Sequence, residues 1–206
     1  WFAPIPSGDV PKRELPKEPT QKEYRRKEII RPVPQQAIYM AFHMCDRRSP
    51  EFYASDMISD ILSRGESCRL HQNLVKEKKI FTEIDAYVSG DMDEGLFVFQ
   101  GKYNDEVSAE QAEEAIWKEI DSFLNTEIAD DELQKVKNKI ESSLRFGEMG
   151  VLNKAMGLCM AEHLEDAELI NTDFDRFENV TKDEILEQAK KILVKENCST
   201  LIYKKA

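Results

Sequence analysis

The chain has 206 residues, of which 41% are hydrophobic and 33% are charged, and its formal net charge at pH 7 is −11. A chain of this length and composition can bury a globular core without a disulfide framework. The acidic excess disfavours nucleic acids and anionic membranes as partners, and no apolar run reaches the roughly 20 residues that span a bilayer.

The first 22 residues predict a tail and linker. Five of the eight prolines lie in this stretch, and proline fixes φ and removes a backbone hydrogen-bond donor. The stretch opens on an apolar segment, Trp1–Pro6, which we interpret as the end of a preceding domain. We therefore expect residues 23–206 to form a single α+β domain and any targeting signal to precede residue 1.

Two strands and a helix are predicted after the linker. Tyr24–Arg31 is rich in charge, as expected of an edge strand, whereas Ala37–Met44 is apolar throughout, as expected of a central strand. We place Ser49 as the N-cap of a helix, because a proline follows it at the first helical position. The helix, Pro50–Ser63, has an apolar face formed by Tyr53, Met57, Ile58, Ile61 and Leu62.

The spacing of apolar residues changes from helical to strand-like within one stretch, Ser67–Tyr87. Cys68–Lys79 is an amphipathic run that Ser67 can cap, so it predicts a short helix. Ile80–Val88 then predicts a strand, and a polar loop with glycine joins it to a second strand, Leu96–Tyr103. Two strands around such a loop predict a β-hairpin.

The second half of the chain is mainly helical. Ser108 and Gln111 form a capping-box pattern that begins a helix ending near Asn125. Thr181 and Glu184 form a second capping box, which begins a helix ending near residue 194.

Between these two helices, Asp130 is placed as the cap of a further helix that Gly147 and Gly150 interrupt. Helical spacing resumes at residues 152–164, a short helix or loop is expected at 168–178, and Ser199–Tyr203 predicts a closing strand. Strands thus come in antiparallel pairs with blocks of helices between them. This order predicts an α+β fold, in which an antiparallel sheet is covered by helices on one face.

The sequence contains no motif for catalysis or metal binding. The three histidines, His43, His71 and His163, lack the second histidine and the glutamate that a zinc-binding helix needs. There is no serine-hydrolase elbow and no phosphate-binding glycine loop, and the acidic pair Asp91 and Asp93 is interpreted as part of a turn. The cysteines form no CxxC pair and are interpreted as scattered thiols: Cys45, Cys68, Cys159 and Cys198. We predict no catalytic residue and no metal ligand in this chain.

The order of these segments resembles the second of the paired domains in the pitrilysin/insulinase-like zinc metallopeptidases. That family includes mitochondrial processing peptidase and the cytochrome bc1 core subunits. The matching pieces are a helix ending at a glycine-containing turn, Ser-x-Arg-Leu at 67–70, a helix ending in Lys-Glu-Lys at 76–78, and the strand after it. The hairpin strand Gly95–Gly101, the helix start Ala129–Lys139 and the opening segment Trp1–Gly8 also fit, so the resemblance covers essentially the whole chain.

The resemblance implies a clamshell in which a zinc-bearing domain and a similarly folded metal-free domain enclose a chamber. Peptides enter the chamber, add as strands to a sheet edge and are cut by zinc-activated water. Because this chain lacks HxxEH, the resemblance assigns it to the metal-free half of a zinc-dependent metalloendopeptidase. It is then no enzyme by itself, zinc is expected in the partner domain on the same or a paired chain, and a peptide is the expected substrate.

Some metal-free domains of the family carry an arginine and a tyrosine, seven residues apart, that reach toward the substrate. The resemblance places Val75 and Thr82 at these positions. Valine has no hydrogen-bond donor for an oxyanion, and the threonine side chain reaches far less than that of a tyrosine. Both residues are therefore expected to face the substrate without taking part in catalysis.

Two roles stay open for such a domain. It is either the non-catalytic wall of an active peptidase or an inactive, partner-binding homologue similar to the core subunits. An HxxEH motif upstream of residue 1 would favour the first role, and a degenerate motif would favour the second. For location, the resemblance leads us to expect a bacterial protein that is exported or periplasmic.

Overall fold

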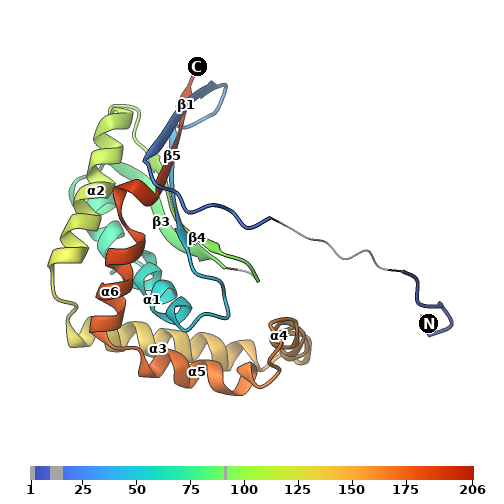
Figure 1. The fold of residues 1–206 in the computed structure, drawn as a ribbon. Coiled ribbons are helices and arrows are strands. Elements are labelled where there is room, and N and C mark those ends of the chain that lie inside the picture. The colour runs from blue at the N-terminus through green and yellow to red at the C-terminus, as the bar shows by residue number, and fades with distance from the viewer. Residues whose placement is uncertain (1–2, 10–15, 91) are drawn as a thin grey trace.

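The structure is a computed structural model that describes residues 3–9, 16–90 and 92–206. The interpretations of Trp1, of linker residues 10–15 and of Asp91 in the acidic loop lie outside these residues. The described linker residues 3–9 and 16–20 are exposed and extend away from the folded body (Figure 1). The chain joins that body at Gln21, whose buried side-chain amide donates to the backbone oxygen of Cys198 at 2.8 Å.

Within the described residues, five strands form one mixed sheet in the spatial order β1-β5-β2-β4-β3 (Figure 1). The strands span Arg25–Arg31 (β1), Ala37–Met44 (β2), Phe81–Ser89 (β3), Gly95–Tyr103 (β4) and Cys198–Lys205 (β5). The predicted edge strand β1, the predicted central strand β2 and the β3–β4 hairpin are confirmed.

The prediction that the strands form antiparallel pairs is wrong at β1. This strand runs parallel to β5, with Arg25 opposite Ser199, and β5 separates β1 from β2. The segment between β1 and β2 contains two prolines, which cannot donate the hydrogen bonds of a tight hairpin. Because β5 lies between β1 and β2, it is hydrogen-bonded to a strand on each side. Its side chains Cys198, Thr200 and Ile202 are buried.

The helices follow the predicted order. They are α1 (Glu51–Ser63), the π-helix η1 (His71–Glu77), α2 (Ala109–Asn125), α3 (Asp130–Gly147), α4 (Val151–His163), α5 (Leu169–Asn179), α6 (Lys182–Ile192) and the short 3-10 helix η2 (Lys195–Asn197). In Figure 1, α1, α2 and α6 lie on one face of the sheet, α3 and α5 run below its end, and α4 lies toward the other face. The α+β class is confirmed. No helix in the described parts of the chain combines the length and apolar character needed to cross a membrane.

One apolar core joins the sheet to the helices on its covered face. On β2, every second side chain is buried: Ile38, Met40, Phe42 and Met44. Phe97 and Phe99 of β4 are fully buried in the same core, together with the predicted apolar face of α1 and the apolar faces of α2 and α6. Burying a side chain of this size stabilises a fold by about 1.5–3 kcal/mol, so the alternation along the strands decides which sheet face takes the helices.

Both predicted capping boxes are confirmed. The side chains of Ser108 and Thr181 accept hydrogen bonds from the backbone N–H groups of Gln111 and Glu184. The side chains of Gln111 and Glu184 accept in return from the backbone of the two caps. Each box satisfies two backbone donors that a helix start otherwise leaves unpaired.

The single-residue caps predicted for α1 and α3 are wrong. Pro50 and Ala129 occupy the cap positions of α1 and α3, and neither makes a side-chain hydrogen bond there. The N–H of Ser49 instead donates to Asp46 Oδ1 at 3.0 Å, so Asp46 closes the turn before α1. Asp130 lies inside the first turn of α3, where the helix dipole favours a negative charge.

Candidate functional site

The stretch that begins at Ser67 forms a π-helix and then an edge strand. The π-helix η1 starts after Leu70, and π turns of this kind are frequent at functional sites. Ser67 does not cap it: Leu70 occupies the cap position, and the Ser67 hydroxyl accepts from the ammonium of Lys135 at 3.3 Å. Just before β3 the chain reverses at Lys79, whose φ is +52°.

Two ionic contacts anchor η1 to the helices. Arg69 donates through Nε and Nη2 to the two carboxylate oxygens of Glu132 on α3, at 2.9 and 2.6 Å. Glu119 of α2 is buried and accepts from both Asn73 and Lys78 at 2.6 Å. Charge-assisted bonds with this two-pronged geometry fix orientation. Arg69, the arginine of the Ser-x-Arg-Leu segment, therefore positions η1 on α3.

Val75 and Thr82 have different surroundings. Val75, on η1, is half-buried and packs against the apolar core. Thr82 is exposed at a β-bulge in β3, and its hydroxyl accepts from Gln35 Nε2 at 2.7 Å and donates to the backbone oxygen of Lys102 at 3.1 Å. The Thr82 hydroxyl thus has two partners within the chain. That the two positions face a substrate stays a prediction.

The sheet face opposite α1, α2 and α6, which we call the open face, carries the alternate side chains of the strands. Its apolar and aromatic members include Ile29, Tyr39, Ala41, Tyr87, Leu96, Val98, Leu201 and Tyr203, of which Val98 is buried. Tyr87 and Leu96 are 42% and 39% exposed. The rings of Tyr39 and Tyr203 meet edge to face with centroids 6.1 Å apart. The open face is therefore partly apolar, and none of the described helices covers it.

A groove of about 820 Å³ lies at one end of the open face. Tyr39, Tyr203 and Leu201 line it together with Gln35 and Lys102, which are the two partners of Thr82. A groove of this size with aromatic walls and a few polar groups can hold a side chain or a short segment of a peptide.

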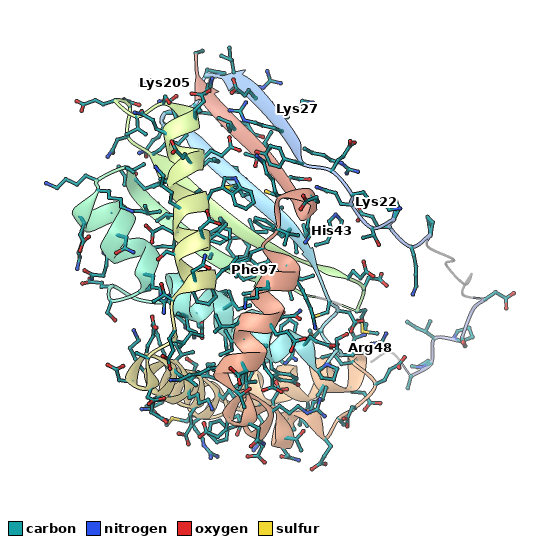
Figure 2. All side chains as sticks on the ribbon, turned by 60° about the vertical axis from the view of Figure 1, so that its left-hand side comes forward. Lys22, Lys27, His43, Arg48, Phe97 and Lys205 are labelled. Carbon is teal, nitrogen blue, oxygen red and sulfur yellow. The ribbon has the colours of Figure 1, made fainter. Side chains whose placement is uncertain are left out.

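Metal-binding side chains are dispersed over the fold. His43 lies on β2 (Figure 2), His71 on η1 and His163 at the end of α4. Across residues 3–9, 16–90 and 92–206, no three His, Cys, Asp or Glu side chains gather as metal ligands. Of the thiols, Cys198 is buried, and burial raises its pKa to about 12, which keeps it protonated at neutral pH.

The profile of the peptidase M16 inactive domain matches residues 1–140, which is more than half of the chain. The chain belongs to the peptidase M16 inactive-domain family. The resemblance drawn from the order of its segments is confirmed. No curated protein sequence matches this M16 domain.

Three solved structures share the fold of the M16 domain. A protease from Helicobacter pylori is 18% identical, with a TM-score of 0.89 over 97% of this chain and 48% of that chain. The peptidase M16 inactive domain from Pseudomonas fluorescens is 16% identical, with a TM-score of 0.81 over 96% of this chain and 47% of that chain. A chain of Complex III2 from Candida albicans is 13% identical, with a TM-score of 0.72 over 87% of this chain and 45% of that chain. The M16 domain spans about half the length of these three chains.

A half-buried ionic cluster lies where α1 meets α5. Nη2 of Arg47, in the loop before α1, lies 2.7 Å from Oδ2 of Asp173 on α5, and the hydroxyl of Tyr53 donates to Oδ1 at 2.6 Å. The Arg47 guanidinium also stacks on the ring of Phe52, 4.3 Å from its centroid. Because Arg47 and Asp173 are 126 residues apart, no local sequence pattern could have paired them.

Asp56 of α1 lies near this cluster, and the charges of Arg47 and Asp173 act on its carboxyl. Burial raises the pKa of its carboxyl to about 6, the negative charge of Asp60 adds to the rise, and Arg47 and Arg64 oppose it. The folded state therefore binds this proton more tightly than the unfolded state, in which the pKa is about 4. Ionised Asp56 destabilises the fold. Its contribution lowers the free energy of unfolding progressively between about pH 4 and pH 6 and no longer changes above that range.

The variant Asp56→Asn is expected to be more stable than the natural chain at about pH 7.5, by about 1–3 kcal/mol, because it removes the buried charge and keeps the shape. At about pH 3, where the natural carboxyl is largely protonated in both states, the difference should nearly vanish. Urea unfolding at the two pH values measures both. Asp121→Asn, at an exposed position of α2, is the matched control and should change little. Equal gains at the two pH values would contradict the assignment.

Proposed function

We propose that the chain is the zinc-free domain of a zinc metallopeptidase and forms part of a substrate chamber opposite a zinc-bearing domain on the same or a partner chain. The family match to the M16 inactive domain is the observation that carries this proposal. In support, the M16 domain covers about half of longer chains, which include a protease. Its partly apolar open face is also of a kind that can line a peptide chamber.

The proposal gives a role to each segment of the chain and to two positions within it. Residues 1–22 are the tail of the preceding domain and a linker, and residues 23–206 are one domain. Val75 and Thr82 are positions that face the substrate without reacting with it, and the zinc belongs to the partner domain. The parent protein is then a zinc-dependent metalloendopeptidase, with a peptide as its substrate and a bacterial, exported or periplasmic location.

A second role is supported by one comparison. The chain of Complex III2 from Candida albicans shares the fold, and that chain is part of a multi-subunit assembly. The alternative is therefore an inactive homologue that binds partner subunits. In that case the companion domain carries no intact HxxEH motif.

Reconstitution with the zinc-bearing domain tests the proposed function. The companion is the domain with HxxEH that lies on the parent chain or is encoded beside it. The companion alone, the M16 domain alone and the two together are assayed with an unfolded, fluorescently quenched peptide. Turnover that requires both parts and stops with a chelator is the expected result. Full turnover by the companion alone would overturn the proposal, as would the absence of turnover by an intact pair that copurifies.

A further inference from the structure

The groove on the open face lies at the end of the sheet where β5 finishes, which Lys205 marks in Figure 2. Its floor is formed by Tyr39 of β2 together with Leu201 and Tyr203 of β5. Pro34, in the connection between β1 and β2, lies at its border. A recess of about 820 Å³ holds one large side chain and the adjoining backbone of an extended peptide.

Two tyrosines give this groove an aromatic floor. The rings of Tyr39 and Tyr203 meet edge to face, with their centroids 6.1 Å apart and their planes at 76°. Both side chains are half-buried, so part of each ring stays accessible. Other edge-to-face pairs, such as Phe42 with Phe99, lie inside the core, where no ligand reaches them. The tyrosine pair can therefore accept a third ring in the geometry that aromatic side chains prefer.

The hydroxyl groups of the same two tyrosines are available to a peptide. Across residues 3–9, 16–90 and 92–206, neither Tyr39 nor Tyr203 uses its hydroxyl in a hydrogen bond. The hydroxyls of Tyr24 and Tyr53, by contrast, donate to Thr200 and Asp173. A phenol without a partner can donate to a peptide carbonyl oxygen or accept from a peptide N–H.

The groove offers no unpaired charge. Its two charged side chains are Lys102 and Asp105. Lys102 pairs with Glu83 at 2.7 Å, and Asp105 pairs with Lys205 at 3.9 Å. A charged side chain that entered the groove would lose water without gaining a free counter-ion, whereas an uncharged ring loses little. The net charge of the chain, −11, does not oppose a neutral side chain.

The groove adjoins the position that the resemblance assigns to the substrate. The hydroxyl of Thr82 accepts from Gln35 and donates to the backbone oxygen of Lys102, and both of these residues line the groove. A peptide that passes Thr82 in the proposed chamber therefore has the aromatic floor beside it.

We propose that this groove is a specificity subsite that takes an aromatic side chain of the peptide substrate, with Tyr39 and Tyr203 as its specificity residues. The inference rests on the proposed function, because it places the groove inside the substrate chamber. It adds the class of peptide that the chamber selects, which is an uncharged segment with phenylalanine, tyrosine or tryptophan. Burial of the ring supplies affinity, and its edge-to-face contact discriminates it from an aliphatic side chain of the same size.

Peptide binding to the chain tests the subsite without zinc. The probes are capped peptides that differ at one central position, which is phenylalanine, cyclohexylalanine, arginine or glutamate. With isotope-labelled tyrosine rings, the phenylalanine peptide should shift the NMR signals of Tyr39 and Tyr203 and leave that of Tyr87, which is exposed on the same face outside the groove. Its dissociation constant should be about threefold or more below that of the cyclohexylalanine peptide, which lacks the aromatic ring. Equal or tighter binding of the cyclohexylalanine peptide would overturn the aromatic preference.

Variants of Tyr203 assign the effect to the ring. Tyr203→Phe keeps the ring and should keep the preference for phenylalanine over cyclohexylalanine, whereas Tyr203→Ala should abolish it. Tyr87→Ala is the matched control on the same face and should leave the preference unchanged. Tyr203→Glu adds an unpaired carboxylate, so the arginine peptide should then bind about tenfold or more tightly than the glutamate peptide. Loss of folding cannot produce this change of preference.

Reconstitution separates the subsite from the proposed function. With the zinc-bearing companion present, the kcat/KM of the phenylalanine peptide should exceed that of the glutamate peptide about tenfold or more, and Tyr203→Ala should reduce this ratio. Turnover that does not depend on the side chain would overturn the subsite alone. A pair without turnover, whose chain still binds the phenylalanine peptide at Tyr39 and Tyr203, would overturn the proposed function alone. Tyrosine signals that shift with chain concentration in the absence of peptide would mean that a second copy fills the groove, and they would overturn the subsite.

Discussion

The purified chain is expected to leave unfolded peptides uncut in the presence of excess zinc and to retain no stoichiometric zinc. The chain lacks the HxxEH helix, and the histidines that could bind metal lie on separate elements, β2, η1 and α4. A catalytic zinc site needs three protein ligands that converge on one ion and an open position for water. Metal analysis after gel filtration and a quenched-peptide assay with and without chelator measure the two outcomes.

Thermal unfolding provides an independent measure of zinc binding. A specific site present at 100 times its dissociation constant would stabilise the folded state by about 2.7 kcal/mol. For a chain of this size that corresponds to a rise in Tm of roughly 5–10 °C. We expect no such rise. The reading as a zinc-free domain fails if the chain shows chelator-sensitive turnover together with one zinc per chain.

The variant Asp173→Ala is expected to lose about 3 kcal/mol of stability. It removes the partner of Arg47, whose side chain is only 19% exposed, and so leaves a guanidinium without its counter-ion in a largely apolar surrounding. The Arg47 Nη1 is already buried with no hydrogen-bond partner among the described residues, so it cannot compensate. The hydroxyl of Tyr53 loses its acceptor as well. Urea unfolding at neutral pH measures the change.

Two further variants distinguish the half-buried pair of Arg47 and Asp173 from an ordinary surface ion pair. Asp173→Asn keeps the shape and one hydrogen-bond acceptor, and it should cost less than Asp173→Ala. Glu187→Ala breaks the exposed pair with Lys191 on α6 and should cost about 0.5 kcal/mol or less. If Asp173→Ala is no more costly than Glu187→Ala, Arg47 does not depend on this carboxylate.

The sequence predicted the elements well because their signals are local. The capping boxes at Ser108 and Thr181 satisfy their helices within four residues, so a short window contains the whole interaction. Single-residue caps were predicted less reliably. At Ser49, the backbone N–H donates to the Asp46 side chain, which closes the turn before α1. The apolar run of β2 likewise needs no distant partner to be recognised, whereas the alternation of buried residues along it is seen only in the structure.

The candidate site was predicted only in part. The resemblance pointed to Val75 and Thr82, and the side-chain chemistry of valine and threonine argued against catalysis at those positions. The contacts of Thr82 with Gln35 and Lys102 could not be predicted, because they depend on the β-bulge and on strand register. The ionic cluster of Arg47 with Asp173 had no sequence signal, since its partners are 126 residues apart in the chain.

By itself, the sequence determined the α+β class, the order of the elements and the membership of a family whose metal-binding motif is missing here. These depend on residue identity and local spacing, which a linear chain displays directly. Only the tertiary structure decided that β5 enters between β1 and β2, that Arg69 anchors η1 on α3, and that α4 packs on α5 while most of its surface stays exposed. Each of these is a choice of partner between distant segments, and such choices are made by burial and hydrogen bonding in three dimensions.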